Sequence, residues 1–402
     1  MHATNHPTEP LYITWVENEQ SRQARWCAEN NTSPPKRVMT SGDTLSADAA
    51  YRLVSQGTSL LWRGDFQNAR QLLQALARRI DKKQDGGKKK HGQDHAASPL
   101  DAFNRHRLRQ SQRTDLLNRL LIELDADAGI ALRRAPDVRE ACLAALAMPG
   151  EPFVLSLRSL QGIIGAYEWR KKGVAVPGLA QPIHVHYGVY SPNRGEYLDL
   201  LAQAPLPTTE LAFDIGTGSG VIAAMLAQRG VRRIIATDMD ERALACAREN
   251  MDLLGFSHIV QTQKADLFPE GRSPLIVCNP PWLPARPTTP IEHAIYDPGS
   301  RMLLGYLDGL ASHLEPVGEG WLIMSDLAEH LGLRSPDFLP RAIAAAGLRV
   351  IDKLETRPRH PKAMDASDPL HAARSAETTA LWRLAAGGRQ IAFVDNVAAH
   401  PY

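Results

Sequence analysis

The stretch from Leu211 to Gly230, LAFDIGTGSGVIAAMLAQRG, constrains the fold of this chain more than any other. Its first five residues form a short apolar run that is typical of a buried strand. Glycines at alternate positions follow, and the apolar segment Val221 to Gln228 predicts a helix that ends before Gly230. Alternate glycines allow positive φ angles and leave no Cβ between the main chain and a ligand. We therefore expect a strand, an open turn and a helix whose positive dipole end faces the ligand.

The spacing of these glycines distinguishes between two kinds of ligand. A dinucleotide-binding turn, G-x-G-x-x-G, needs glycine where this chain has Val221. The chain instead has D-x-G-x-G-x-G, which resembles motif I of the class I S-adenosylmethionine-dependent methyltransferases. The resemblance implies an α/β fold with a seven-stranded Rossmann-like sheet and S-adenosylmethionine as the cofactor. It assigns cofactor binding to Asp214, Gly216, Thr217, Gly218 and Gly220.

Three later segments follow in the order that this family has. The apolar run from Ile234 ends at Asp238, whose carboxylate can accept both hydroxyl hydrogens of a ribose. After a third expected strand, residues 259–263, the resemblance makes Asp266 an acceptor for the adenine amino group. A fourth strand, residues 275–278, runs into Asn279-Pro280-Pro281-Trp282. Each segment alone has a simpler interpretation, as a helix cap or a strand end. Further cofactor contacts are predicted at Met239, Leu267 and Asn279.

The Asn-Pro-Pro-Trp segment predicts the chemistry. An amide or ring-amino nitrogen is a poor nucleophile because its lone pair is delocalised, and two hydrogen-bond acceptors on its N–H groups would counter this. The Asn279 side-chain oxygen and the Pro280 carbonyl can serve, since prolines fix the backbone. The Trp282 ring can stack on a planar acceptor group. We predict Asn279, Pro280, Pro281 and Trp282 as catalytic residues, in a motif that protein glutamine and nucleic-acid adenine methyltransferases share.

The segment from Gly188 to Tyr197 precedes motif I and resembles the Pro-Arg-Glu segment of the HemK-like release-factor glutamine methyltransferases. That family has arginine directly after proline, whereas Asn193 intervenes here. The alternative is a helix start with Asn193 as its cap and Glu196 at the third helical position. The candidates for contact with the substrate are Tyr190, Pro192, Arg194 and Glu196.

Patterning divides the rest of the chain. We expect a flexible tail over 1–43 and a mainly helical N-terminal domain over 44–172, in which Asp65 caps a helix and residues 116–121 are also helical. A basic low-complexity loop is expected at 81–98 and a β-hairpin linker at 173–187. The class I methyltransferase domain is expected over 188–386, followed by a C-terminal tail over 387–402.

The cysteine spacing, the hydropathy and the histidines of the sequence bear on the cellular compartment and on metal binding. The four cysteines are scattered without C-x-x-C spacing, which favours a reducing cytoplasm over a disulfide framework or a zinc ribbon. No basic-apolar leader and no apolar run of about 18 residues is present, so we predict a cytoplasmic protein without a membrane span. His184 and His186 share one strand face and could chelate a metal, but no third ligand is nearby, so we expect no metal.

The charge distribution leaves the substrate open. Lys and Arg exceed Asp and Glu in the first 180 residues, with a Lys88-Lys89-Lys90 run, which indicates either electrostatic binding to RNA or to an acidic protein partner, or a solvated loop. Phe, Tyr and Trp are absent between Phe66 and Phe103, so stacking platforms for bases are lacking there. We predict an N-methyltransferase acting on a macromolecule, with a protein glutamine side chain favoured. The alternatives are a base amino group of RNA or DNA, such as adenine N6, and a non-catalytic cofactor-binding scaffold.

Overall fold

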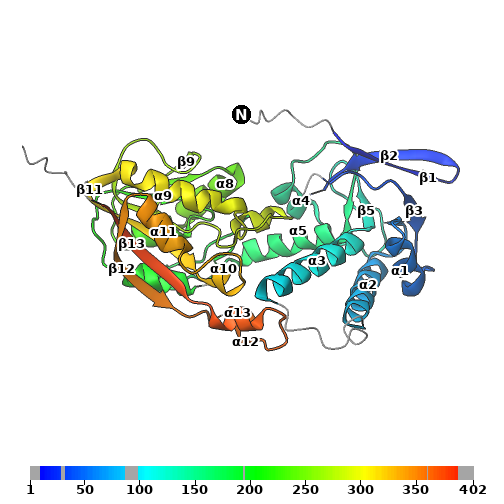
Figure 1. Ribbon diagram of the computed structural model, residues 1–402. Helices are drawn as coiled ribbons and strands as arrows, with labels where there is room; N and C mark the ends of the chain where they lie inside the picture. Colours follow the sequence, from blue (N-terminus) through cyan, green and yellow to red (C-terminus); the bar gives the residue numbers. More distant parts are fainter. Residues whose placement is uncertain (1–9, 29–31, 87–97, 193–194, 360, 388–402) are drawn as a thin grey trace, which may run out of the picture.

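The computed structural model describes residues 10–28, 32–86, 98–192, 195–359 and 361–387, and it shows two lobes side by side (Figure 1). Each lobe is built on a sheet of its own, with six strands in the N-terminal lobe and seven in the C-terminal lobe. Separate apolar cores accompany the two sheets. None of the helices in these ranges combines the length and the apolar character needed to cross a membrane.

The C-terminal sheet has the strand order β12-β13-β11-β10-β7-β8-β9. Strand β13 is antiparallel to both of its neighbours, and the remaining pairs are parallel. This arrangement confirms the predicted seven-stranded Rossmann-like α/β fold. The strands are β7 (Ala212–Ile215), β8 (Ile234–Asp238), β9 (Val260–Lys264), β10 (Ser273–Cys278), β11 (Leu314–Ser325), β12 (Leu348–Thr356) and β13 (Thr379–Ala386).

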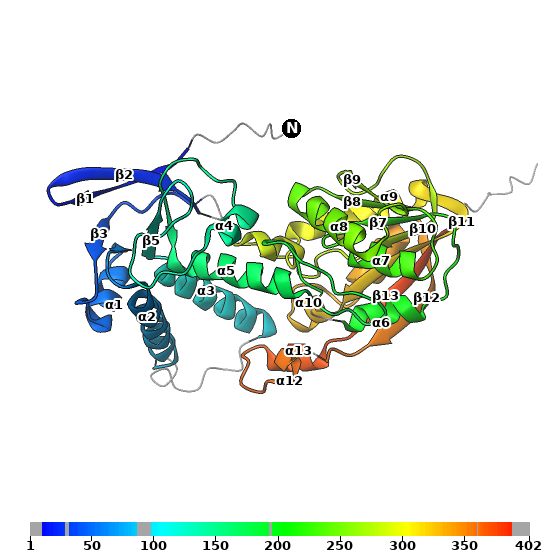
Figure 2. The same ribbon diagram turned by 180° about the vertical axis from the view of Figure 1, so that it is seen from behind.

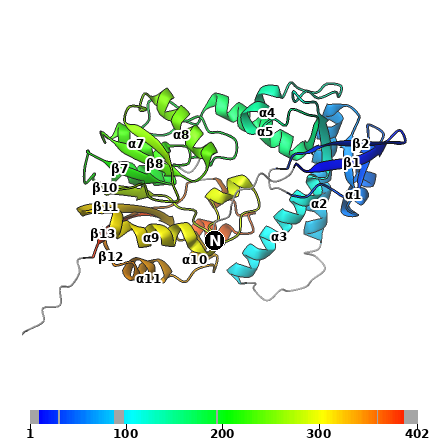
Figure 3. The same ribbon diagram turned by 90° about the horizontal axis from the view of Figure 1, so that it is seen from above.

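Helices cover both faces of this sheet because its central strands are apolar on both sides. Figure 3 shows α7 and α8 on one side and α9 and α11 on the other. Alternation along β7 places Ala212 in the core under α7 and Phe213 in the core under α9. The helices of this lobe are α6 (Glu196–Gln203), α7 (Val221–Gln228), α8 (Glu241–Leu254), α9 (Arg301–His313), α10 (Leu327–His330), α11 (Phe338–Ala345), α12 (Pro361–Met364) and α13 (His371–Ala376).

The N-terminal lobe corrects two predictions, the mainly helical domain and the flexible tail over 1–43. Its six strands run in the order β1-β2-β6-β5-β4-β3, and three of them lie in the expected tail. Leu120 and Leu121, expected in a helix, belong to β5. The strands are β1 (Tyr12–Glu17), β2 (Gln20–Trp26), β3 (Val38–Ser41), β4 (Ser59–Trp62), β5 (Leu120–Leu124) and β6 (Phe153–Ser156).

Strand β4 and the pairing of β2 with β6 escaped the sequence patterns for a physical reason, whereas β1 and β2 form a local hairpin with Glu17 opposite Gln20. All four residues of β4 are buried, and such a short apolar run shows no alternation that separates strand from helix. The polar strand β2 pairs with β6, where Arg25 lies opposite Phe153 across more than a hundred residues of sequence. A pairing that distant leaves no local signal.

The helices of the N-terminal lobe agree better with expectation. Asp65 caps α2 as predicted, since its Oδ1 accepts from the Gln67 N–H at 2.8 Å. The expected loop over 81–98 begins later, because α2 continues to Gly86; residues 87–97 lie outside the described ranges. The helices are α1 (Ala47–Ser55), α2 (Phe66–Gly86), α3 (Pro99–Leu117), α4 (Arg139–Ala145) and α5 (Leu157–Lys172).

The linker over 173–187 differs from the prediction, and the C-terminal tail is mostly outside the described residues. Instead of the hairpin predicted over 173–187, the structure has one isolated antiparallel bridge between Val174 and Ile183. Most of the predicted tail over 387–402 lies outside the described residues.

Two helices of the N-terminal lobe reach the C-terminal lobe. The end of α5 is joined to α8 by an ion pair between Arg170 and Glu249. The first turns of α3 lie near α10 and α13 (Figure 2), and Phe103 is buried there in a cluster with Leu283 and Leu331. The two lobes are therefore in contact at two places, one between α5 and α8 and one between α3 and the cluster that contains Leu283 and Leu331.

Candidate active site

The predicted motifs meet at one edge of the seven-stranded sheet. Ile215 lies opposite Cys278 on one side and opposite Thr237 on the other. The residues that follow these three strand ends are therefore neighbours, which brings together the glycine turn, Asp238 and Asn279. Ligands of open α/β sheets bind outside the carboxyl ends of the strands, which is this edge.

The glycine turn has the backbone shape that the sequence predicts. Gly216, Gly218 and Gly220 have φ angles of +71°, +55° and +81°. A Cβ at Gly216 would lie 2.4 Å from the Met302 methyl carbon, whereas a Cβ at Gly218 would meet nothing within 4 Å. Gly218 thus presents bare backbone to open space beside the N-terminus of α7.

Asp238 at the end of β8 is tied to this turn. Its Oδ2 accepts from the Gly218 N–H at 3.0 Å, and its Oδ1 accepts from the Asp240 N–H at 2.9 Å. Burial raises the pKa of this carboxyl, and the backbone hydrogen bonds oppose that shift. Each carboxylate oxygen has a further lone pair, so the group can still accept from two hydroxyls.

Asp214 lies beneath the turn and is fully buried. Its Oδ2 accepts from Thr217 Oγ1 at 2.6 Å and from the Ala223 N–H at 3.1 Å, while its Oδ1 has no hydrogen-bond partner in the described structure. Burial raises the pKa of Asp214 to about 7. A buried carboxylate oxygen without a partner is costly, so this position suits a donor supplied by a ligand.

Asp266 has a partner that the sequence did not indicate. Its Oδ2 accepts from Arg301 at 2.6 Å on the protein surface. Leu267, which follows, has a φ angle of +77°, and its carbonyl accepts from Thr237 Oγ1 at 2.6 Å. Met239 is 55% exposed, so an apolar side chain is available at the same edge.

The Asn-Pro-Pro-Trp segment folds back on itself. Asn279 Oδ1 accepts from the Trp282 indole N–H at 3.0 Å. The indole is half-buried against the cores on both faces of the sheet, and Pro280 is buried. The amide oxygen of Asn279 therefore has one lone pair engaged by Trp282 and one left for an incoming N–H group.

Arg334, between α10 and α11, is a site residue that the sequence analysis missed. Its Nη1 donates to the Trp282 carbonyl at 3.0 Å and its Nη2 donates to Ser300 Oγ at 2.8 Å. Burial lowers the pKa of this guanidinium. A single arginine between two helices carries no sequence signal, because its partners are 52 and 34 residues away.

The segment before motif I leads into α6. Burial raises the pKa of Tyr197, and the charges of Tyr190, Asp214 and Glu196 add to that shift. Glu196 begins α6 and is buried, Pro192 is buried, and Arg194 lies outside the described residues. Gly195 is the N-cap of α6 and Glu196 is its first residue rather than its third as predicted, while Asn193 lies outside the described residues.

The two histidines of the linker have structural partners. His184 Nδ1 donates to the Arg170 carbonyl at 2.6 Å, and His186 Nε2 lies 2.7 Å from Glu249 Oε2. Burial lowers the pKa of His186. Within the described ranges, no group of three or more His, Cys, Asp or Glu side chains could hold a metal ion.

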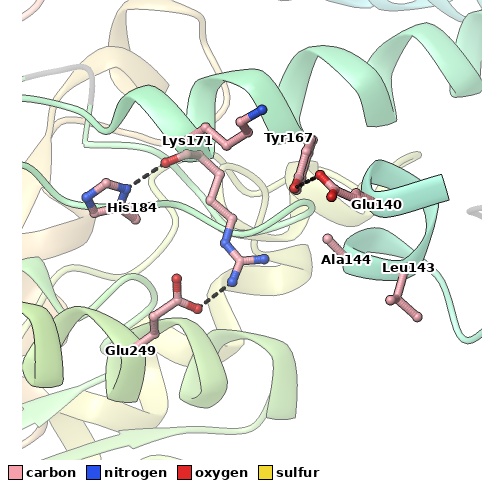
Figure 4. A pocket seen from close by; sticks show the side chains of 8 residues that line it. Glu140, Leu143, Ala144, Tyr167, Lys171, His184 and Glu249 are labelled. Atoms are coloured by element: carbon pink, nitrogen blue, oxygen red, sulfur yellow. Dashed lines mark hydrogen bonds and ion pairs between the residues drawn. The ribbon is translucent and has the colours of Figure 1, made fainter. Parts of the chain in front are cut away.

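A cleft of about 410 Å³ opens between α4, α5 and α8 (Figure 4). Its acidic groups already have partners, since Tyr167 donates to Glu140 at 2.8 Å and Arg170 pairs with Glu249. No lining residue comes from the glycine turn or from residues 279–282, so we place the active site at the strand ends instead. The lining residues are Glu140, Leu143, Ala144, Tyr167, Arg170, Lys171, His184 and Glu249.

Part of the chain matches a known family of domains. Residues 182–325 match the family model described as "Methyltransferase small domain". This part of the chain is therefore similar to methyltransferase small domains. The match includes the glycine turn, Asp238, Asp266 and the Asn-Pro-Pro-Trp segment. S-adenosylmethionine is the cofactor of this domain, and the bare Gly218 backbone, the Asp238 oxygens and the unpartnered Asp214 oxygen fit it.

Relatives of this domain differ in their named substrates. The chain is 41% identical over 88 residues to a tRNA1(Val) (adenine(37)-N6)-methyltransferase of Erwinia tasmaniensis, covering 20% of this chain and 36% of that protein. It is 32% identical over 161 residues to a release factor glutamine methyltransferase of Cereibacter sphaeroides, covering 36% and 56%. Both alignments thus span only part of the relative's length.

A solved methyltransferase from Thiobacillus denitrificans in complex with S-adenosyl-L-homocysteine is 17% identical, with a TM-score of 0.36. The alignment covers 50% of this chain and 94% of that one.

Proposed function

We propose that the protein is an S-adenosylmethionine-dependent N-methyltransferase that methylates a planar amide or amino nitrogen of a macromolecule. The observation that carries this proposal is the position of Asn279, which follows β10 beside the glycine turn and keeps a lone pair of its amide oxygen for a substrate. When bound, the cofactor supplies an electrophilic methyl group.

The chain's own residues would hold the cofactor at the strand ends. The Gly216–Gly220 turn offers bare backbone at Gly218, Asp238 accepts from ribose hydroxyls, and Asp214 accepts from a donor at the buried end of the site. Asp266 accepts from the adenine amino group, with Met239 and Leu267 against the ring. These roles come from the resemblance, and they suit the burial and the hydrogen bonds described above.

The acceptor side would be shaped by residues 279–282. The Asn279 oxygen and the Pro280 carbonyl accept the two N–H groups of the substrate and shift electron density toward its nitrogen. Trp282 forms a flat wall for the acceptor group, and its hydrogen bond to Asn279 keeps that amide oriented. No proton-transferring triad is required, because the nitrogen loses its proton to solvent after the methyl group is transferred.

Two acceptors are consistent with this geometry. We favour a protein glutamine side chain, which is supported by the resemblance of residues 188–197 to the segment before motif I of the HemK-like family and by the partial identity to a release factor glutamine methyltransferase. The second candidate is a base amino group of RNA, which is supported by the basic excess of the first 180 residues and by the identity to a tRNA adenine methyltransferase.

Transfer of labelled methyl into a cell extract tests both acceptors. Label from S-adenosylmethionine that is released by protease and resists ribonuclease would support the glutamine acceptor. Label that is released by ribonuclease and resists protease would contradict the glutamine acceptor and support the RNA acceptor. Absence of transfer to either fraction, with the cofactor still bound, would contradict the proposed activity.

A further inference from the structure

The loop from Leu283 to Asp297 directly follows the Asn-Pro-Pro-Trp segment. Its two ends are joined to each other, since the Leu283 N–H donates to the Ile295 carbonyl at 3.1 Å and the Asp297 N–H donates to the Leu283 carbonyl at 2.8 Å. A displacement of this loop would therefore be passed to Trp282, the residue that precedes it.

Arg107 on α3 of the N-terminal lobe contacts the middle of this loop. It donates from Nη2 to the Arg286 carbonyl at 2.6 Å and lies 3.8 Å from the Glu292 carboxylate. Its guanidinium also lies 4.2 Å from the centre of the Tyr296 ring. One side chain thus binds the loop through a carbonyl, a carboxylate and an aromatic face, and it is only 21% exposed.

The loop is arranged to receive this contact. Glu292 Oε2 also accepts from the Thr288 N–H at 2.7 Å and from Thr288 Oγ1 at 2.8 Å, so the same carboxylate closes the loop and faces Arg107. One turn earlier on α3, Phe103 is 3% exposed and packs in a cluster with Leu283. The apolar contact and the charged contact both come from one face of one helix.

We propose that Arg107 is a positioning residue that fixes the 283–297 loop, so that the N-terminal lobe sets the shape of the acceptor site. This inference rests on the proposed methyl transfer. Arg107 acts through the loop and does not touch the cofactor turn, so its removal alters the acceptor side and leaves cofactor binding intact.

The physical reason for an interlobe contact is the composition of the loop. Residues 283–297 contain three prolines, which donate no backbone hydrogen bond, and the loop's internal hydrogen bonds lie at its two ends and within residues 288–296, whereas the Arg286 carbonyl is held by Arg107 of the other lobe. Arg107 supplies a constraint from outside the loop, because its Nη2 donates to that carbonyl while its charge faces the Glu292 carboxylate.

The test compares Arg107→Ala with Arg113→Ala. Arg113 lies on the same helix, but it pairs with Asp81 inside the N-terminal lobe at 2.7 Å. Two readouts are measured on the full chain, namely hydrogen exchange of residues 283–297 and initial rates of methyl transfer against extract concentration. Hydrogen exchange needs no substrate, so it separates a failure of this inference from a failure of the proposed activity.

We expect Arg107→Ala to accelerate exchange in 283–297, leave exchange in 211–230 unchanged, and lower kcat/KM by at least about tenfold. The dissociation constant for S-adenosylmethionine should stay the same. Arg107→Lys, which keeps the charge facing Glu292 and Tyr296, should recover part of the loss. Wild-type exchange and wild-type kcat/KM in Arg107→Ala would overturn the inference, as would an equal loss in Arg113→Ala.

Discussion

Replacing Asn279 by alanine should abolish most turnover while cofactor binding persists. The substitution removes the side-chain oxygen that would accept from the substrate nitrogen, at the edge where β10 meets the glycine turn. It also removes the partner of the Trp282 indole, which lies 3.0 Å from that oxygen. The indole is half-exposed, so its N–H can turn to water and the folded state should persist.

The expected magnitude combines these two effects. Loss of one preorganised polar group that acts on the reacting atoms typically lowers kcat by about 10²–10³, or about 2.7–4 kcal/mol. Loss of one ordinary hydrogen bond changes the free energy of unfolding by only about 0.5–1.5 kcal/mol. The kcat of Asn279→Ala should therefore be lower by about two to three orders of magnitude, while the melting temperature changes little.

Trp282→Phe is the matched control. It removes the indole N–H and keeps an aromatic ring, so the Asn279 oxygen loses its internal donor and remains available to substrate. We expect kcat to fall by less than about tenfold, because the lost hydrogen bond corresponds to less than about 1.4 kcal/mol. Both variants are assayed by labelled methyl transfer and by calorimetric titration with S-adenosylmethionine. Full activity in Asn279→Ala would refute the proposed role of this side chain.

Three further predictions concern the cofactor, pH and stability. Asp238→Ala should raise the dissociation constant for S-adenosylmethionine by about 10- to 100-fold, since a charged hydrogen-bond acceptor and its anchor on Gly218 are lost; an unchanged titration would contradict this assignment. Burial raises the pKa of Asp214 to about 7, so its stabilising effect in the cofactor-free protein is complete below the ordinary value of about 4 and is lost as pH rises through 7. The melting temperature should therefore fall between pH 4 and 7, and Asp214→Asn should flatten that profile; identical slopes would exclude the buried carboxyl as the cause. Leu61 in β4 is fully buried, so Leu61→Ala should lower the free energy of unfolding, measured in urea, by about 2–5 kcal/mol. Leu108 on α3 is 59% exposed, so Leu108→Ala should lower it by at most about 0.5 kcal/mol. Equal losses in the two variants would argue against the six-stranded sheet.

The motifs of the seven-stranded sheet were predictable because they act locally. A strand, a glycine turn and a helix are consecutive in sequence, and positive φ angles at Gly216, Gly218 and Gly220 require glycine whatever surrounds them. The acid at the end of β8 and the segment after β10 were also visible, since each follows an apolar strand directly. The parallel arrangement then brings these strand ends to one edge.

Partners of the site residues were not predictable, because they come from distant parts of the chain. Nothing near Asp266 indicates that Arg301 pairs with it, and nothing near Trp282 indicates that Arg334 binds its carbonyl. The same is true of Arg107, whose contacts on the 283–297 loop lie 179 to 189 residues further along the chain.

The sequence by itself therefore determined the fold of the C-terminal lobe and the cofactor, because backbone conformation and strand order impose local patterns. The tertiary structure alone decided that the N-terminal lobe contains a sheet. β2 is polar and its second partner, β6, is distant in sequence, and β4 is too short to show a period. It also decided which side chains hold the 283–297 loop, since contacts between the lobes depend on how the two folded lobes pack together.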